Sequence, residues 1–174
     1  MTSSASPKIE MGWLHPVDGD RTFVLQAESK AVGRIRFEDE CGARSAAEWN
    51  GRRWTFECTG AFRHCIVIRA EGSDTPVAEF TRFLAGGGVA SFANGSQYNW
   101  VRTHLWSGRW CFRSRQQKSA VCVSQEAGAL MQGGRVAVCA GALEREETHV
   151  LVLLAWYLRI LETFELAESP LVCA

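Results

Sequence analysis

Val150-Leu151-Val152-Leu153-Leu154-Ala155-Trp156-Tyr157-Leu158 is the stretch that decides the fold of this 174-residue chain. A helix at a protein surface keeps one polar face, and this run offers none, so a helix formed here must be enclosed on every side. Glutamates at 144, 146 and 147 suit the positive end of a helix dipole, and Pro170 stands beyond the expected end. We therefore predict a buried helix from about Glu144 to Leu166.

A membrane-spanning helix is the alternative to an enclosed one. Spanning requires about 20 mostly apolar residues. Arg159 closes the apolar run, and Glu162 and Glu165 interrupt the apolar residues that follow it. The run is too short to span, so we expect a core helix and no transmembrane segment.

The chain upstream of the helix has the pattern of short strands. Residues 33–37 and 53–58 alternate between apolar and polar side chains, as strands with one buried face do. Asn50-Gly51 and Asn94-Gly95 indicate hairpins, because both residue types tolerate positive φ. Further strands are predicted over residues 9–14, 21–27, 62–70, 75–83, 110–115, 120–124 and 135–140. The sequence thus predicts a mainly β fold, an antiparallel β-barrel of about twelve strands enclosing a hydrophobic C-terminal α-helix.

The length of the chain favours a single domain. We assign residues 1–8 to a disordered polar tail, 9–167 to the barrel domain and 168–174 to a C-terminal tail. The first tail lacks the apolar core of a signal peptide, and Thr2 replaces the glycine that myristoylation needs, so we predict a cytoplasmic protein. The formal net charge of zero argues against a strong nucleic-acid binder.

No metal, cofactor or catalytic residue is predicted. The seven cysteines are odd in number and contain no Cys-x-x-Cys pair, so we expect seven reduced, mostly buried thiols and no zinc site. Asp18-Gly19-Asp20 fits a turn better than a cation site. Gly86-Gly87-Gly88 fits a loose hairpin, because the Lys-Ser or Lys-Thr of a P-loop does not follow it.

The expected architecture resembles the tubby C-terminal-like fold. The resemblance rests on the strand-rich stretch 9–140, the Asn94-Gly95 hairpin with Tyr98 and Trp100, and the helix over 150–160. Tubby domains, phospholipid scramblases and plant LURP-one-related proteins share that fold, so the resemblance implies a small scramblase-like or LURP-one-like barrel. The phosphoinositide-binding motif of tubby domains and the Pro-rich, Cys-rich and calcium-binding segments of scramblases have no match here. The resemblance therefore transfers no binding residue.

Two charged clusters are candidate sites. Arg109, Arg113 and Arg115 share one parity of a strand, opposite Trp110 and Phe112, and Lys118 follows them. Such a cluster suits phosphate head groups or a nucleic-acid backbone, and the alternative is a solvated barrel exterior. The second cluster is Arg159 with Glu162, its helical partner, at the mouth of the barrel or as a buried functional charge.

Two functions are compatible with these features. The leading hypothesis is a non-enzymatic cytosolic binding or scaffold module that recognises anionic lipid, another anionic ligand or a protein partner. The second is an enzyme or small-molecule carrier with an apolar, Trp-lined pocket at the interior or mouth of the barrel. A helix that fills the barrel would confine any substrate to surface sites.

Overall fold

The computed structural model describes residues 8–15, 21–39, 42–59, 64–84, 86–103, 108–116, 118–125 and 133–168, with side chains of the long helix described as far as Glu162. Of the expected tails at 1–8 and 168–174, the structure describes only Lys8, which belongs to the first strand, and Glu168, which ends the long helix; the turn at 18–20 lies outside the described residues. The described residues form twelve strands, β1 (Lys8–Leu14), β2 (Thr22–Ala27), β3 (Lys30–Phe37), β4 (Arg44–Trp49), β5 (Arg52–Thr59), β6 (Cys65–Ala70), β7 (Pro76–Arg82), β8 (Gly88–Phe92), β9 (Gln97–Arg102), β10 (Trp110–Ser114), β11 (Ser119–Gln125) and β12 (Gly133–Cys139). A 3-10 helix, η2 (Ala140–Ala142), precedes the long helix α1 (Glu146–Glu168).

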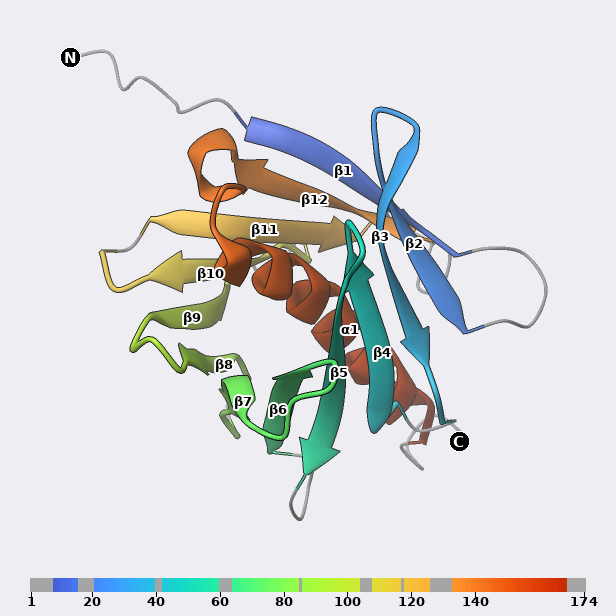
Figure 1. The fold of residues 1–174 in the computed structure, drawn as a ribbon, viewed down its shortest axis with the longest axis vertical. Coiled ribbons are helices and arrows are strands. Elements are labelled where there is room, and N and C mark those ends of the chain that lie inside the picture. Colours follow the sequence, from blue (N-terminus) through green and yellow to red (C-terminus); the bar gives the residue numbers. More distant parts are fainter. Residues whose placement is uncertain are drawn as a thin grey trace.

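The strands close into one antiparallel barrel around α1 (Figure 1). Each described strand pairs with its neighbour in sequence, and β12 pairs with β1 to complete the ring. The predicted fold, an antiparallel barrel enclosing a C-terminal helix, is confirmed. The helix begins at Glu146 rather than Glu144, because a turn closed by the Arg145 amide on the Ala142 carbonyl (3.1 Å) precedes it.

Helix α1 occupies the centre of the barrel. Every residue from Val150 to Leu158 exposes at most 1 % of its surface, so the run has no solvent-facing side. Alternate residues of the strands point inward to meet it. Trp156 stacks on Trp13 of β1 and Tyr157 stacks on Phe37 of β3, each with ring centroids 5.6 Å apart. The helix and its aromatic partners therefore take the space that a ligand would need inside the barrel.

The two Asn-Gly hairpins are present but differ in geometry. Asn50 (φ 47°) and Gly51 (φ 83°) both have positive φ, as a two-residue type I′ turn requires. In the β8–β9 hairpin only Gly95 has positive φ (87°), and the Phe92 amide donates to the Ser96 carbonyl across a three-residue loop. The second loop is therefore a type I turn followed by a left-handed glycine.

Cys111 of β10 and Cys122 of β11 form a disulfide. They lie directly opposite each other in the strand register, with Cα atoms 4.1 Å apart. The expectation of seven reduced thiols is wrong for this pair, because the register that makes them neighbours leaves no local sequence signal. Cys65 and Cys139 are free thiols among the described residues.

Candidate functional site

A pocket opens at the end of the barrel that α1 reaches with Leu158 to Glu162. Its volume is about 380 Å³, and it lies between the β7–β8 connection, the end of β9 and the start of β10. We call this region the barrel mouth; its described lining residues are Arg82, Phe83, Leu84, Gly86, Gly87, Trp100, Arg102, Gly108, Trp110, Leu158, Arg159 and Glu162.

An aromatic wall forms one side of the barrel mouth. Trp100 and Trp110 stack with ring centroids 5.4 Å apart, and Trp100 also contacts Phe112 at 4.6 Å. The glycine run lies in a hairpin between β7 and β8, as the sequence predicts, and this hairpin packs closely against the aromatic wall. Gly87 has φ of 79°, and a Cβ there would lie 2.6 Å from the Trp100 carbonyl oxygen. Glycine thus lets the β7–β8 connection approach the wall.

Three arginines bring positive charge to the barrel mouth. Arg82 ends β7, Arg102 ends β9 and Arg159 comes from α1. Glu162 is the one carboxylate among the described lining residues, and Arg159 forms an ion pair with it one helical turn away. The arginines have contacts within the protein, so they are held in place around the pocket. The excess of positive charge beside an apolar wall suits an anion that carries an apolar group.

Arg82 and Arg102 were not identified from the sequence. They lie 20 positions apart in the sequence, and no spacing rule connects them. Only the barrel register brings them together, because β7 and β9 both pair with β8 and end on the same side.

The predicted basic cluster is spread along the length of β10. β10 pairs with β9 without a shift from Trp110 to Ser114, and the shift against β11 between Phe112 and Arg113 skips Ala120 of β11, so the parity along β10 is kept. Arg109 lies just before β10, whereas Arg115 and Lys118 lie in the turn after it, on the order of 15 Å away along a five-residue strand. Arg115 donates to Oε1 of Gln97 at 2.7 Å. Arg113 is half-buried, and no partner of its buried Nε is found in the described part of the chain.

At the opposite end of the barrel, Glu147 fastens α1 to the β8–β9 hairpin. Its carboxylate accepts hydrogen bonds from the Asn94 amide, from the Ser96 hydroxyl at 3.0 Å and from the Tyr98 hydroxyl at 2.7 Å. Burial raises the pKa of Glu147, but the hydrogen bonds together outweigh it, so the pKa lies below its ordinary value. Burial and the neighbouring Glu147 carboxylate raise the pKa of Tyr98. These hydrogen bonds therefore stabilise the packing of α1 against the β8–β9 hairpin at that end of the barrel.

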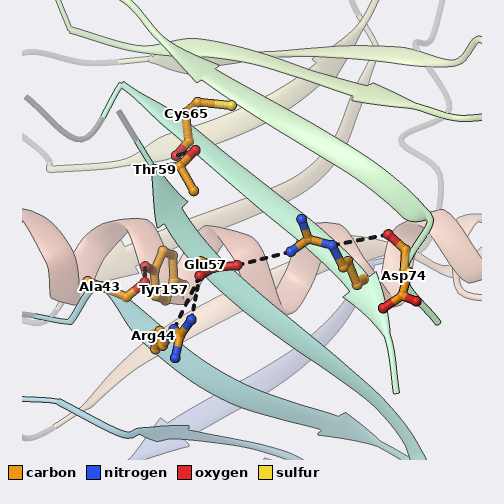
Figure 2. A network of polar contacts seen from close by, with 8 residues as sticks. Ala43, Arg44, Glu57, Thr59, Cys65, Asp74 and Tyr157 are labelled. Carbon is orange, nitrogen blue, oxygen red and sulfur yellow. Dashed lines mark hydrogen bonds and ion pairs between the residues drawn. The ribbon is translucent and has the colours of Figure 1, made fainter. Parts of the chain in front are cut away.

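The outer surface of β4 to β6 carries a network of matched charges (Figure 2). Glu57 accepts from Arg44 at 2.7 Å and from Arg69 at 3.1 Å, and Arg69 also donates to the Asp74 carbonyl. The hydrogen bond from Arg44, with its positive charge, lowers the pKa of Glu57. The Glu57 carboxylate is thus paired with arginine on the outer face of these strands, as expected for a solvated barrel exterior.

Two other kinds of site are absent from the described residues. No group of three or more His, Cys, Asp or Glu side chains there could hold a metal ion. No helix in that part of the chain combines the length and apolarity that crossing a membrane would take.

Comparison with known proteins gives no assignment. No family model, no curated protein and no solved structure matches this chain. The tubby-like resemblance therefore stays a prediction, and the function must be inferred from the barrel mouth itself.

Proposed function

We propose that the protein is a non-enzymatic binding module that holds an anionic ligand, such as the head group of an anionic lipid, at its barrel mouth. One observation carries the proposal: arginines from β7, β9 and α1 line the same pocket as the stacked pair Trp100 and Trp110. Guanidinium groups form paired hydrogen bonds with phosphate and carboxylate oxygens. The aromatic wall and Leu158 offer apolar contact to whatever chain or ring carries the anionic group.

The contents of the pocket favour binding over catalysis. The described lining residues include no histidine, cysteine or serine, and their one carboxylate, Glu162, is paired with Arg159. A general acid–base mechanism needs a group able to exchange a proton with the substrate. The described lining thus supplies positive charge and apolar surface, and its one carboxylate is already paired with arginine.

A small-molecule carrier or enzyme at the same mouth is the second candidate. The volume of about 380 Å³ falls within the range typical of small-molecule pockets, about 300–1,000 Å³. The barrel interior gives this candidate no support, because α1 occupies it. Both candidates therefore place the ligand at the barrel mouth.

Vesicle flotation at low salt tests the lipid form of the proposal. We expect the wild type to float with phosphatidylserine or phosphoinositide vesicles and not with phosphatidylcholine vesicles. Each basic side chain near an anionic surface contributes about 1 kcal/mol. Arg102→Glu removes a positive charge and adds a negative one, so it should weaken binding by about 2 kcal/mol, or about 30-fold. Arg115→Glu is the matched control, since Arg115 is exposed at the far end of β10. Loss of flotation in Arg115→Glu alone would instead assign the site to the predicted basic cluster.

Native mass spectrometry with dihexanoyl phosphatidylserine, a soluble short-chain lipid, tests the pocket itself. We expect one adduct on the wild type and none on Trp110→Ala, which removes half of the aromatic wall. Binding to vesicles without binding of the soluble lipid would place recognition on the surface around the pocket. A wild type that binds neither probe, and carries no co-purified anion, would refute the proposal.

A further inference from the structure

Exposed apolar side chains gather at one end of the barrel. Among the described residues, the exposed large apolar side chains are Leu84 (94 % exposed), Phe83 (48 %), Leu14 (47 %) and Ile9 (37 %). Leu14 ends β1, and Phe83 and Leu84 follow β7. Alternate strands of an antiparallel barrel end on the same side, so these three lie at the end where the barrel mouth opens, and Ile9 lies near the other end. We call Phe83 and Leu84 the apolar tip. Exposed apolar groups that lie together indicate a contact with another molecule.

Hydrogen bonds hold the apolar tip at the edge of the barrel mouth. The Phe83 amide donates to the Gly87 carbonyl at 3.1 Å, and the Gly86 amide donates to the Phe83 carbonyl at 3.0 Å. Both residues of the tip line the same pocket as the arginines. Because β7 runs towards the mouth, the tip lies farther out along the barrel than Arg82, the last residue of that strand. The turn thus presents Leu84 to solvent in a fixed position beyond the end of β7.

The order of these groups matches the order of groups in an anionic bilayer. In such a bilayer the charged head groups lie at the surface and the hydrocarbon chains lie directly beneath them. The barrel mouth presents arginines around its pocket and the apolar tip farther out. An end-on approach therefore brings the arginines to the head groups and the tip to the acyl chains, whereas a soluble anion in the pocket would leave Leu84 in water.

We propose that the mouth end of the barrel docks on an anionic membrane with Phe83 and Leu84 inserted among the acyl chains; this rests on the function proposed for the barrel mouth. The pocket holds one head group, and the other lipids of the anionic surface face the same positive end. Arginine suits this depth, because its apolar stem can lie along the hydrocarbon while its guanidinium stays among the head groups. Leu14, half-exposed on the opposite side of the ring, favours the end-on orientation.

The contact should be weak and should need both of its parts. A single acyl anchor gives only marginal, reversible membrane binding, and two side chains bury less apolar surface than such an anchor. Neutral vesicles should therefore not retain the protein, whereas anionic vesicles should, because the arginines add electrostatic attraction. Burial of one leucine side chain still corresponds to roughly tenfold or more in affinity, so the loss of the tip is measurable.

Flotation with mixed phosphatidylcholine and phosphatidylserine vesicles tests the insertion. Leu84→Ser should weaken binding by roughly tenfold with an unchanged melting temperature, because Leu84 makes almost no contact within the fold. Leu84→Trp should bind at least as tightly as the wild type, because tryptophan favours the membrane interface. Ile9→Ser is the matched control, since it removes an exposed apolar side chain near the other end of the barrel, and it should bind like the wild type.

The salt dependence of flotation separates insertion from attraction between charges. Salt screens the arginines but does not weaken the burial of a leucine. The loss caused by Leu84→Ser should therefore keep its size between about 0.1 M and about 0.5 M salt, while the loss caused by Arg102→Glu should shrink over that range. Flotation that depends on Leu84 but is unchanged by Arg102→Glu would overturn the proposal, because the tip would then act without the barrel mouth.

Binding of soluble dihexanoyl phosphatidylserine distinguishes the failure of this proposal from the failure of the proposed function. A wild type that binds this lipid but does not float with anionic vesicles would overturn the insertion and leave the tip to a protein partner. A Leu84→Ser variant that floats like the wild type would overturn the insertion while the proposed function stands. A wild type that neither floats nor binds the soluble lipid would refute both.

Discussion

Replacing Gly134 with alanine should reveal how closely the barrel wall is fitted to α1. Gly134 lies on β12 opposite Trp13, and a Cβ at this position would lie 2.5 Å from Cζ3 of Trp156 and 3.0 Å from the Ser124 carbonyl oxygen. Carbon atoms in contact normally stay about 3.5–4.0 Å apart. The indole of Trp156 cannot retreat easily, because Trp13 stacks on it and Phe23 packs against it edge-on at 5.8 Å.

The loss of folding stability in Gly134→Ala should be near the upper end of the range seen when a packed core receives extra atoms. Added carbon atoms in a packed core cost about 1–3 kcal/mol, and the second contact here is with backbone, so we expect about 3 kcal/mol. Gly12→Ala is the matched control, since Gly12 lies on the neighbouring strand β1 and a Cβ added there would meet nothing within 4 Å. Gly12→Ala should stabilise the fold by about 0.5–1 kcal/mol, because the unfolded chain has less conformational freedom to lose with alanine than with glycine.

Thermal and urea unfolding of the two variants would measure the difference. For a chain of this size about 3 kcal/mol corresponds to a drop of roughly 6–12 °C in melting temperature. The double variant Gly134→Ala/Trp156→Leu should be more stable, by at least about 1 kcal/mol, than the sum of the two single losses predicts, because the ring that the added methyl group meets is gone. Equal melting temperatures for Gly134→Ala and Gly12→Ala would refute the packing of Trp156 against β12.

Three further outcomes are expected. Leu154→Asp should yield insoluble protein on expression, because it buries a carboxylate without a partner at a cost of several kcal/mol; a soluble, cooperatively folding variant would contradict the central helix. Glu147 has a folded-state pKa below its ordinary 4.5, so the unfolded chain takes up its proton first as the pH falls. Unfolding measured over a range of pH should therefore show that the stabilisation by Glu147 is complete above about pH 5 and is lost progressively as the pH falls further. The free energy of unfolding of Glu147→Gln should lack that part of the pH dependence. Alkylation of denatured, non-reduced protein should leave Cys111 and Cys122 unmodified by mass, and modification of both would show that they are not bonded.

The fold was predictable because its signals are local. A helix without a polar side must be surrounded, and the run from Val150 to Leu158 has no polar side chain to form one. Asn50-Gly51 marks its hairpin because the type I′ turn needs positive φ at two successive residues. Both signals act over a few residues, and neither depends on how the ring closes.

The two arginines of the candidate site that were missed are brought together by the register between strands, which local sequence patterns do not show. Arg82 and Arg102 meet at the barrel mouth only because two strands flank a third and stop at the same edge. The alternation that groups Arg109 with Arg113 is kept along β10, which pairs with β9 without a shift, but alternation does not show how far a cluster spreads along its strand. Arg159 and Glu162 were identified because a helical spacing of three is itself local.

The position of α1 after all twelve described strands has a consequence for biosynthesis. A ribosome adds about 5–20 residues per second, so the inner faces of the strands emerge on the order of ten seconds before the helix that covers them. During that interval the nascent chain holds Trp13, Phe23 and Phe37 without the partners they have in the finished barrel. We therefore expect β12 to close the barrel against β1 only after α1 has been made, so that the unclosed nascent chain exposes apolar surface of the kind that chaperones bind.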